Sequence, residues 1–581
     1  MNKVIFIILV LFSFASLWAQ GTIIPRPSSG SVDTAAGKIS TQTMLAKFQF
    51  ADYVIEKIGS TYYANPNIRS SYVTYSSTNF KTMMDGVMSQ LVNGGLVFIK
   101  AQVDTGLDAG AITIIYSNIT ICGAGKNLTK LKLKYHADIG ISATIGLVEA
   151  SNISNPTLQD IELDGNGANQ TKVDANASLT AVLNGVRLGW TGIVNNPTIK
   201  DCYIHDFTEF GVWYVIVSNG IIKDCSIQNN YWNNITLSKD VSLSKVTNCY
   251  FTGSSDASIA NYGTDNTVEN CFINDVGGGH GSTGGYWALA MEGDGGSLGT
   301  PTRCSIINNR ITGSHIQMAV ALASYAKDFV IRDNTIWDIS LANSNTIYIL
   351  HSDSGLISGN KIIRSINNNI LLDHSRGNII SNNEISRDNG FGYGVDLSVS
   401  PCNIIKGNYL DSYYGVRTTS GSDSNKVVDN IIKSNVNGAD IIDGGIGTIF
   451  NKNYGSGKWL AETGTEARVQ NRTIIVDTSM VTLTDTISFW RTDRAIVIDS
   501  ILVVGNGAAM SVTVDYRYGL TRNGAGTAII NSPSASTSIT YGTVVTSFNS
   551  ASIPAGSFVR FRFSAVTTKS QVTIIAYYHY A

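Results

Sequence analysis

A short motif that recurs every 22–26 residues is the feature that most limits how this chain folds. Cysteine marks it in IKDCYIHDF, IKDCSIQNN, VTNCYFTGS and VENCFINDV, at positions 202, 225, 249 and 271. Asparagine takes the same place in the following segments, at positions 309, 334, 360, 383, 408 and 430. One interval between successive marks is longer: 38 residues separate Cys271 from Asn309. A period of this length indicates stacked units, none of which can bury its apolar side alone.

Each unit is built from short β-branched runs separated by Asn, Asp and Gly, which predicts strands and turns rather than helices. Ten such units predict one right-handed parallel β-helix over residues 100–456. Successive coils pair like neighbouring strands, about 4.8 Å apart, so equivalent residues form a column. Stacked Asn side chains can hydrogen-bond to each other and to turn backbone, which lets a polar residue survive burial. We therefore expect Asn309 to Asn430 to form one ladder.

Composition excludes several functions. Charged residues make up 14% of the chain and the formal net charge is −2, so no basic surface for nucleic acid is expected. The seven cysteines would suggest disulfides in an exported protein. Four of them fall in the repeat column, however, and are expected to be buried and unpaired. No cysteine or histidine spacing indicates zinc, and no metal is assigned, with a calcium ion left open.

The N-terminal residues MNKVIFIILVLFSFASLWAQ resemble a cleavable secretory signal over residues 1–20. Their apolar run is shorter than the ~20 residues that a membrane-spanning helix needs. Residues 21–47 are expected to be a flexible leader. We therefore predict export to the periplasm or the extracellular space and no membrane span.

With its Asn and Cys ladders, the repeat region resembles the pectate-lyase-like right-handed parallel β-helix superfamily. The segment NFKTMMDGVMSQLVNGG (79–95) resembles the helical cap that precedes the first coil in that superfamily. The resemblance covers residues 48–456. It implies the fold but leaves the function open, because this fold hosts lyases, hydrolases, epimerases, adhesins and phage tailspikes.

Two family motifs are present only in part. Gly279-His280-Gly281 matches the last of three polygalacturonase motifs, but no acidic pair stands on the coil before it, where Ser254-Ser255-Asp256 is the nearest match. Trp337-Asp338 matches half of a pectate lyase motif whose histidine is missing. The catalytic mechanisms of polygalacturonases and pectate lyases are therefore not assigned to this chain. GGGHGSTGG lies in the long interval and is interpreted as a turn insertion over 277–285 that forms one wall of a groove.

Aligning the strand that follows each ladder position predicts which outward side chains share a face. Glu292 is placed in one column with Ala323, Leu350, Asp373 and Ser398, and Asp294 two residues further along. Ionisable side chains gather on this face, which predicts a catalytic or ligand-binding cleft. The predicted catalytic residues are Glu292, Asp294, His351, Asp373 and His374. The predicted substrate-binding residues are Trp287, Tyr348, Arg376, Asp396 and Arg417.

The repeat stops near residue 456. A linker over 457–465 is followed by strands with period-two alternation, which predict an antiparallel β-sandwich of the jelly-roll type over 466–581. This region resembles the C-terminal modules of tailspike-like proteins, which implies sugar binding or assembly of a homotrimer.

These observations favour a secreted polysaccharide-degrading enzyme whose β-helix groove holds an extended, acidic glycan. Glycoside hydrolase and polysaccharide lyase both stay open, as does a non-catalytic carbohydrate-binding or tailspike-like adhesin.

Overall fold

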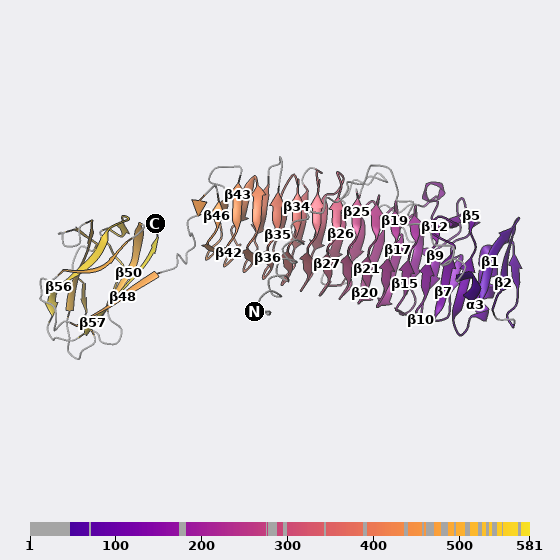
Figure 1. Cartoon of the computed structure of the whole chain (residues 1–581), viewed down its shortest axis with the longest axis horizontal. Coiled ribbons are helices and arrows are strands. Elements are labelled where there is room, and N and C mark those ends of the chain that lie inside the picture. Colours follow the sequence, from indigo (N-terminus) through magenta and orange to yellow (C-terminus); the bar gives the residue numbers. More distant parts are fainter. Residues whose placement is uncertain are drawn as a thin grey trace, which may run out of the picture.

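The structure is a computed structural model of the whole chain (Figure 1). It describes residues 47–581 except 69–70, 173–181, 275, 277–286, 294–298, 342–343, 387–391, 435–439, 456–457, 460–469, 478–485, 493–494, 506–511, 521–525, 530–533, 537–542, 549, 567–570 and 581. The predicted signal over 1–20 and all of the predicted leader over 21–47 except Lys47 therefore lie outside the described residues. Among the helices that are described, none combines the length and the apolar character needed to cross a membrane.

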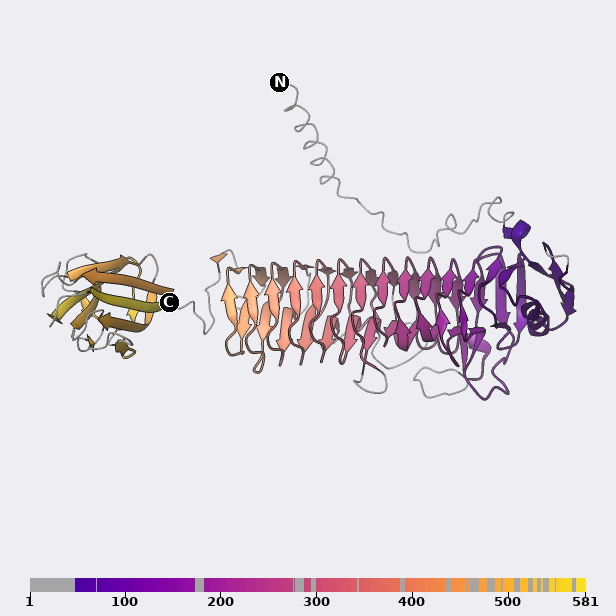
Figure 2. The same ribbon diagram turned by 90° about the horizontal axis from the view of Figure 1, so that it is seen from below.

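The predicted parallel β-helix is confirmed: consecutive coils contribute one strand each to three long sheets, and paired strands of different coils run parallel (Figures 1 and 2). Sheet A begins with the antiparallel strands β1 (Tyr53–Ile58), β2 (Thr61–Pro66) and β3 (Tyr75–Ser77). Its parallel strands are β4 (Gly95–Ile99), β7 (Ile119–Gly123), β11 (Thr157–Gln159), β15 (Thr198–Lys200), β18 (Ile221–Lys223), β21 (Lys245–Thr247), β24 (Thr267–Glu269), β27 (Ser305–Ile307), β30 (Val330–Arg332), β33 (Leu356–Ser358), β36 (Ile379–Ser381), β39 (Ile404–Lys406), β42 (Lys426–Val428) and β45 (Ile449–Asn451).

Sheet B consists of β5 (Gln102–Leu107), β8 (Thr129–Leu133), β12 (Glu162–Asp164), β16 (Tyr203–His205), β19 (Ser226–Gln228), β22 (Tyr250–Thr252), β25 (Phe272–Asn274), β28 (Arg310–Thr312), β31 (Thr335–Trp337), β34 (Lys361–Ile363), β37 (Glu384–Ser386), β40 (Tyr409–Ser412), β43 (Ile431–Ser434), β46 (Tyr454–Gly455) and the antiparallel β47 (Lys458–Trp459).

Sheet C consists of β6 (Ile112–Ile114), β9 (Ile145–Ala150), β13 (Leu183–Leu188), β17 (Val212–Ser218), β20 (Ile235–Ser242), β23 (Ala257–Asn261), β26 (Trp287–Glu292), β29 (Met318–Ala323), β32 (Asn345–Leu350), β35 (Ile370–Asp373), β38 (Tyr393–Ser398), β41 (Tyr414–Thr418) and β44 (Ile441–Asp443), with β10 (Ile153–Ser154) and β14 (Val194–Asn195) at its border.

The predicted asparagine ladder is confirmed. In each pair of neighbouring coils, the side-chain oxygen of one ladder Asn accepts from the backbone N–H and the side-chain amide of the Asn before it, as between Asn360 and Asn383 at 3.0 Å. The ladder continues one coil further than predicted, to Asn453. The residue before each ladder Asn is left-handed: Asn308, Asp333, Asn382 and Asp429 have φ of 53–57°, and Gly359 and Gly407 have φ of 64° and 66°. The dipeptides NN, DN and GN therefore encode a turn residue followed by a buried ladder residue.

The cysteine column is also as predicted. Cys202, Cys225, Cys249 and Cys271 are buried, no cysteine forms a disulfide, and the Cys271 backbone N–H donates to Asn309, which continues the column. Two ladders that the sequence analysis did not identify run between sheets C and A. One is a serine ladder through Ser352, Ser375, Ser400 and Ser422, and the other an asparagine ladder through Asn378, Asn403 and Asn425.

At the N-terminal end, helix α3 (Phe80–Gln90) lies within the segment 79–95. The Asn79 side chain caps it by accepting from the Thr82 backbone N–H, and its apolar face buries Phe80, Met83, Met84, Val87 and Met88. These side chains belong to the same hydrophobic core that fills the coils. An open stack of coils needs such a cover at its end.

The C-terminal region forms two five-stranded antiparallel sheets. Sheet D contains β48 (Gln470–Asp477), β50 (Ile496–Gly505), β54 (Thr543–Val545), β55 (Ser552–Ile553) and β57 (Gln571–Tyr580), and sheet E contains β49 (Thr486–Arg491), β51 (Val512–Gly519), β52 (Thr527–Ala528), β53 (Ser534–Ser536) and β56 (Phe558–Val566). One hydrophobic cluster joins Ile501 and Ile574 of sheet D to Val559 and Phe561 of sheet E.

Candidate active site

The register of sheet C agrees with the alignment made from the sequence. Glu292 pairs with Ala323, which pairs with Leu350, Asp373 and Ser398 in turn on successive coils. A second outward column contains Ala290, Ala321, Tyr348, Leu371, Asp396 and Arg417. Asp294, His280 and the rest of the 277–285 insertion lie outside the described residues.

Glu292 ends strand β26 with a half-buried carboxyl group. The Tyr262 hydroxyl donates to its Oε2 at 2.9 Å, while its Oε1 is buried and has no hydrogen-bond partner among the residues that the structure describes. Burial and the negative charge of Asp256 raise the pKa of Glu292 to about 7, against the lowering effect of the Tyr262 bond. A carboxyl group in this state keeps its proton near neutral pH, which is the property of a general acid.

Asp256 is a candidate site residue that the sequence analysis missed. It lies directly before strand β23, and the Trp232 indole donates to its Oδ2 at 2.8 Å. Burial raises the pKa of Asp256, which the Trp232 bond partly offsets. Its segment, Ser254-Ser255-Asp256, was noticed only as an incomplete family motif. The signal that could have identified Asp256 is its position one coil before the insertion and Glu292.

Small side chains surround these two carboxyl groups. Ala257, Ala260 and Ala290 are buried in one cluster, and Trp287 and Tyr262 pack against them. Trp287 starts strand β26, where its backbone N–H donates to the Asp256 carbonyl at 2.8 Å. Strand pairing thus ties together the coils that carry Asp256 and Glu292.

A row of aromatic side chains follows sheet C from these carboxyl groups towards the N-terminal coils. We call Trp190, Phe210, Trp213 and Trp232 the aromatic row. The ring centroids of Trp190 and Trp213 are 5.4 Å apart, those of Phe210 and Trp213 5.3 Å, and those of Phe210 and Trp232 6.3 Å. Trp232 joins the row to Asp256 through its indole bond.

Asp373, His374 and His351 form a second group further along the same face. His374 bonds to Asp373 at 2.8 Å, the two imidazole centroids are 4.9 Å apart, and the Tyr325 ring stacks on His351. Three coils separate Asp373 from Glu292, which is roughly 14 Å at the usual strand spacing. Of the predicted catalytic residues that the structure describes, Glu292 therefore lies apart from His351, Asp373 and His374, and Asp294 is not described.

The predicted substrate-binding residues are also dispersed. Asp396 is buried and accepts two bonds from Arg417, at 2.8 and 2.6 Å, so these two charges neutralise each other. Arg376 lies on an exposed turn, where its backbone N–H donates to Asp353. Tyr348 lies beside Asp373, and burial together with that carboxylate raises the pKa of the Tyr348 phenol.

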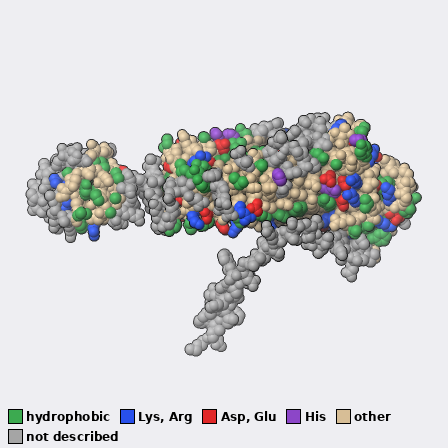
Figure 3. All heavy atoms as spheres, turned by 90° about the horizontal axis from the view of Figure 1, so that it is seen from above, with side chains coloured by type: hydrophobic (Ala, Val, Ile, Leu, Met, Phe, Trp, Pro, Cys, Tyr) green, Lys and Arg blue, Asp and Glu red, His purple; other side chains and the backbone are tan. Residues whose placement is uncertain are grey.

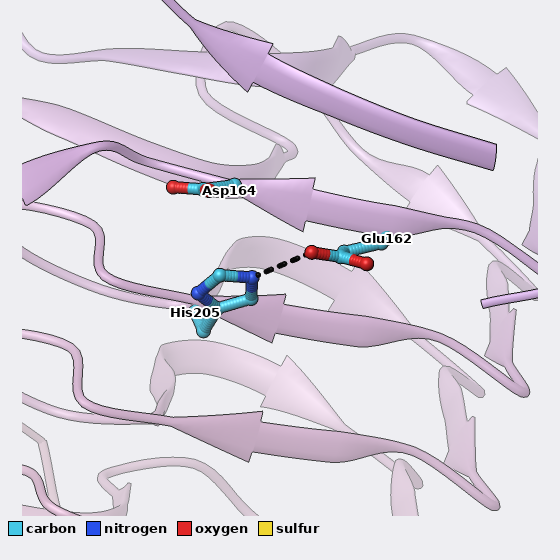
Figure 4. Close-up of side chains that lie close together, drawn as sticks. All are labelled: Glu162, Asp164 and His205. Carbon is cyan, nitrogen blue, oxygen red and sulfur yellow. Dashed lines mark hydrogen bonds and ion pairs between the residues drawn. The ribbon is translucent and has the colours of Figure 1, made fainter. Parts of the chain in front are cut away.

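A separate cluster on sheet B could be mistaken for a metal centre (Figure 4). Ligand atoms of Glu162, Asp164 and His205 lie within 4.8 Å of one another. Lys130 Nζ, however, is 2.8 Å from both carboxylates, and the two ring nitrogens of His205 bond to Asp206 and Glu162. Burial alone would lower the pKa of His205, but the bonds to Asp206 and Glu162 raise it to about 9. The donor set is therefore occupied by protons and an ammonium group, which does not fit a resident metal.

This cluster predicts how stability depends on pH. Because the folded pKa of His205 is above the unfolded value of about 6.5, its stabilisation is complete below pH 6.5 and is lost as pH rises to about 9. The shift corresponds to about 3 kcal/mol of unfolding free energy. We expect His205→Gln to remove this part of the pH dependence in denaturant titrations at pH 6 and pH 9.5. The partly exposed His136→Gln is the control, and destabilisation of the wild type by a chelator would contradict the interpretation.

The chain matches one family model over part of its length. The model of the family described as "Periplasmic copper-binding protein (NosD)" matches residues 289–458, less than a third of the chain. No curated protein matches the sequence. The resemblance to the pectate-lyase-like right-handed parallel β-helix superfamily is confirmed at the level of the fold.

Three of the solved structures that match are a mannuronan C-5 epimerase module, a DFA-IIIase and a phage tailspike. The AlgE4 A-module of Azotobacter vinelandii is 16% identical over 66% of this chain and 95% of that chain, with a TM-score of 0.45. DFA-IIIase from Arthrobacter chlorophenolicus A6 is 12% identical over 56% and 91%, with a TM-score of 0.43. The tailspike of E. coli bacteriophage HK620, solved with a pentasaccharide, is 14% identical over 86% and 88%, with a TM-score of 0.44.

Proposed function

We propose that this chain hydrolyses glycosidic bonds of a polysaccharide that lies across the outward face of sheet C. The observation that carries the proposal is the Glu292 carboxyl group on the outward face of sheet C, which accepts a hydrogen bond from Tyr262 and whose pKa is raised to about 7 by burial and by the charge of Asp256. Two carboxyl groups whose environments differ are what acid–base cleavage of a glycosidic bond requires.

The surroundings of the two carboxyl groups indicate which one acts as the acid and which one as the carboxylate. The charge of Asp256 raises the pKa of Glu292, so Asp256 is the group that ionises first. Glu292 then keeps its proton and acts as the general acid on the leaving oxygen. Tyr262 donates to Oε2 of Glu292, so we assign the proton to Oε1, which has no hydrogen-bond partner in the part of the chain that the structure describes. Asp256 acts as the carboxylate that activates water or attacks the sugar.

The surroundings of the pair support a sugar substrate. Aromatic faces line the same side of sheet C, and they suit the apolar faces of sugar rings. A face built from stacked coils is long and regular, which suits an extended polymer. We include in this proposal export directed by residues 1–20, and a β-sandwich over 466–581 that binds sugar or assembles a homotrimer.

Lyase chemistry is less well supported. A lyase needs a base beside a cation that neutralises the substrate carboxylate. Tyr348 lies beside Asp373 of the second ionisable group, but its pKa is raised, which disfavours the phenolate. Copper binding is not carried over from the family description either, because that family model matches less than a third of the chain.

The products distinguish these functions. We expect new reducing ends from one or more polymers of a panel of neutral and acidic glycans, without the ultraviolet absorbance of an unsaturated product. Unsaturated products would show a lyase and overturn the assignment of Glu292 as the acid in hydrolysis. Binding without any cleavage would favour the adhesin.

A further inference from the structure

The aromatic row has more exposed surface than a purely structural cluster needs. Trp190 is 48% exposed, and Trp213 is half-buried on the outward side of β17. The Trp213 indole N–H donates to the Ser238 hydroxyl at 3.0 Å, which holds the ring in one orientation. The row belongs to strands and turns of consecutive coils, from the turn after β13 to the turn before β20, and Asp256 lies at the start of the next coil.

We infer that the aromatic row binds uncharged sugar units of the substrate, on the N-terminal side of Glu292 and Asp256. The inference rests on the proposed hydrolase function and adds to it the class of substrate and the side on which it is held. It also replaces the acidic glycan expected from the sequence.

The geometry of the row fits a chain of sugar rings. Coils are about 4.8 Å apart, so Trp190, Trp213 and Trp232 present their rings at successive steps along the β-helix axis. Stacking on aromatic rings holds flat apolar faces without requiring a charge on the ligand. Trp232 contacts both Phe210 and the Asp256 carboxylate, so a sugar bound on the row is placed next to the reacting bond.

The charges near the site oppose an acidic substrate. Neither Glu292 nor Asp256 has a cation among the groups that shift its pKa. The segments 275–286 and 294–298, which flank β26 in the sequence, contain no Lys or Arg. A uronic acid bound here would bring its carboxylate next to Asp256, where the like charge repels it.

Arg187, the cation in contact with the Trp190 ring, is already neutralised. Arg187 lies over the Trp190 ring at 4.7 Å and bonds to Glu149 through Nε at 2.7 Å and through Nη2 at 2.5 Å. Elsewhere, acidic and basic side chains are interspersed on the face drawn in Figure 3. Recognition along the row therefore depends on stacking and hydrogen bonds.

The test uses full-length protein silenced by Glu292→Gln. Affinity electrophoresis is run in gels that contain xylan, mannan or hydroxyethyl cellulose, and in gels that contain polygalacturonate or alginate. We expect retardation by one or more of the uncharged polymers and a roughly 10-fold loss of affinity on adding Trp213→Ala or Trp190→Ala. Trp337→Ala is the matched control, because Trp337 lies on sheet B, stacked on Phe272.

Two results would overturn the inference: retention by the acidic polymers alone or by none, or unchanged affinity in both tryptophan variants. Loss of affinity in Trp337→Ala to the same extent would also overturn it, since the tryptophans of the row would then contribute no more to polymer binding than a tryptophan on sheet B. These outcomes are separate from the hydrolase proposal, which is decided by the products of the wild-type protein. A protein that cleaves a polymer while Trp213→Ala binds that polymer unchanged retains the proposed function and loses the inferred binding surface.

Discussion

Glu292→Gln is expected to lower turnover about 10²–10⁴-fold and, above pH 7, to make the protein more stable. The loss of activity follows because glutamine has the shape of the protonated acid but cannot donate the proton to the leaving oxygen. The gain in stability follows from the pKa of Glu292, which burial and Asp256 raise to about 7 in the folded chain, from 4.5. Because the pKa of Glu292 is higher in the folded chain than in the unfolded chain, protonation of Glu292 stabilises the folded chain. This contribution is fully present below pH 4.5 and is lost as pH rises through 7.

Above pH 7 the wild type therefore carries a buried negative charge that the variant lacks. We expect the variant to be more stable by about 3 kcal/mol at pH 8, and to differ little at pH 4.5. Thermal melting at both pH values and initial rates of reducing-end release measure the two effects. Glu269→Gln is the control, because Glu269 lies on sheet A and pairs with Lys245. Full activity, or equal stability of variant and wild type at pH 8, would contradict the role given to Glu292.

The wild-type rate should fall on the alkaline side of pH 7. Hydrolysis needs Glu292 protonated and Asp256 ionised, so kcat/KM is expected to rise with the ionisation of Asp256 and to fall as Glu292 loses its proton near pH 7. A pH–rate profile checks this. An alkaline limb that stays flat beyond pH 9 would exclude Glu292 as the general acid.

Asn383→Ala is expected to destabilise the β-helix by about 4 kcal/mol. The Asn383 side chain donates to the Ile357 carbonyl and to Asn408, and its oxygen accepts from the backbone and the side chain of Asn360. Alanine leaves several of these buried groups without a partner, and each costs about 1–3 kcal/mol.

The adjacent Asn382 is a matched control. It is exposed and left-handed at φ 54°, so glycine fits its backbone, and we expect Asn382→Gly to change stability by less than about 1 kcal/mol. Denaturant titration of the two variants compares a buried ladder Asn with a turn Asn one residue away. Similar losses in both variants would show that the ladder bonds contribute little.

Much of the β-helix could be predicted because the positions of the repeated residues specify how successive coils align. Each buried Asn marks the start of a sheet B strand, and counting from it placed Glu292, Asp373 and Ser398 in the column that the structure shows. The same count could not separate the two ionisable groups, because it orders side chains along a strand but says nothing of which carboxyl is buried. It also passed over Asp256, whose importance comes from Trp232 and Glu292, neighbours on other coils.

Repeat spacing and residue type alone decided which side chains share a column, since parallel coils pair in register and a one-residue slip would expose every buried Asn and Ile. The folded chain alone decided what those side chains can do. Burial beside Asp256 gives Glu292 a proton at neutral pH, and contacts across coils join Trp190, Phe210, Trp213 and Trp232 into one surface. These properties depend on solvent exclusion and on distances between residues remote in the chain, which no local pattern of residues specifies.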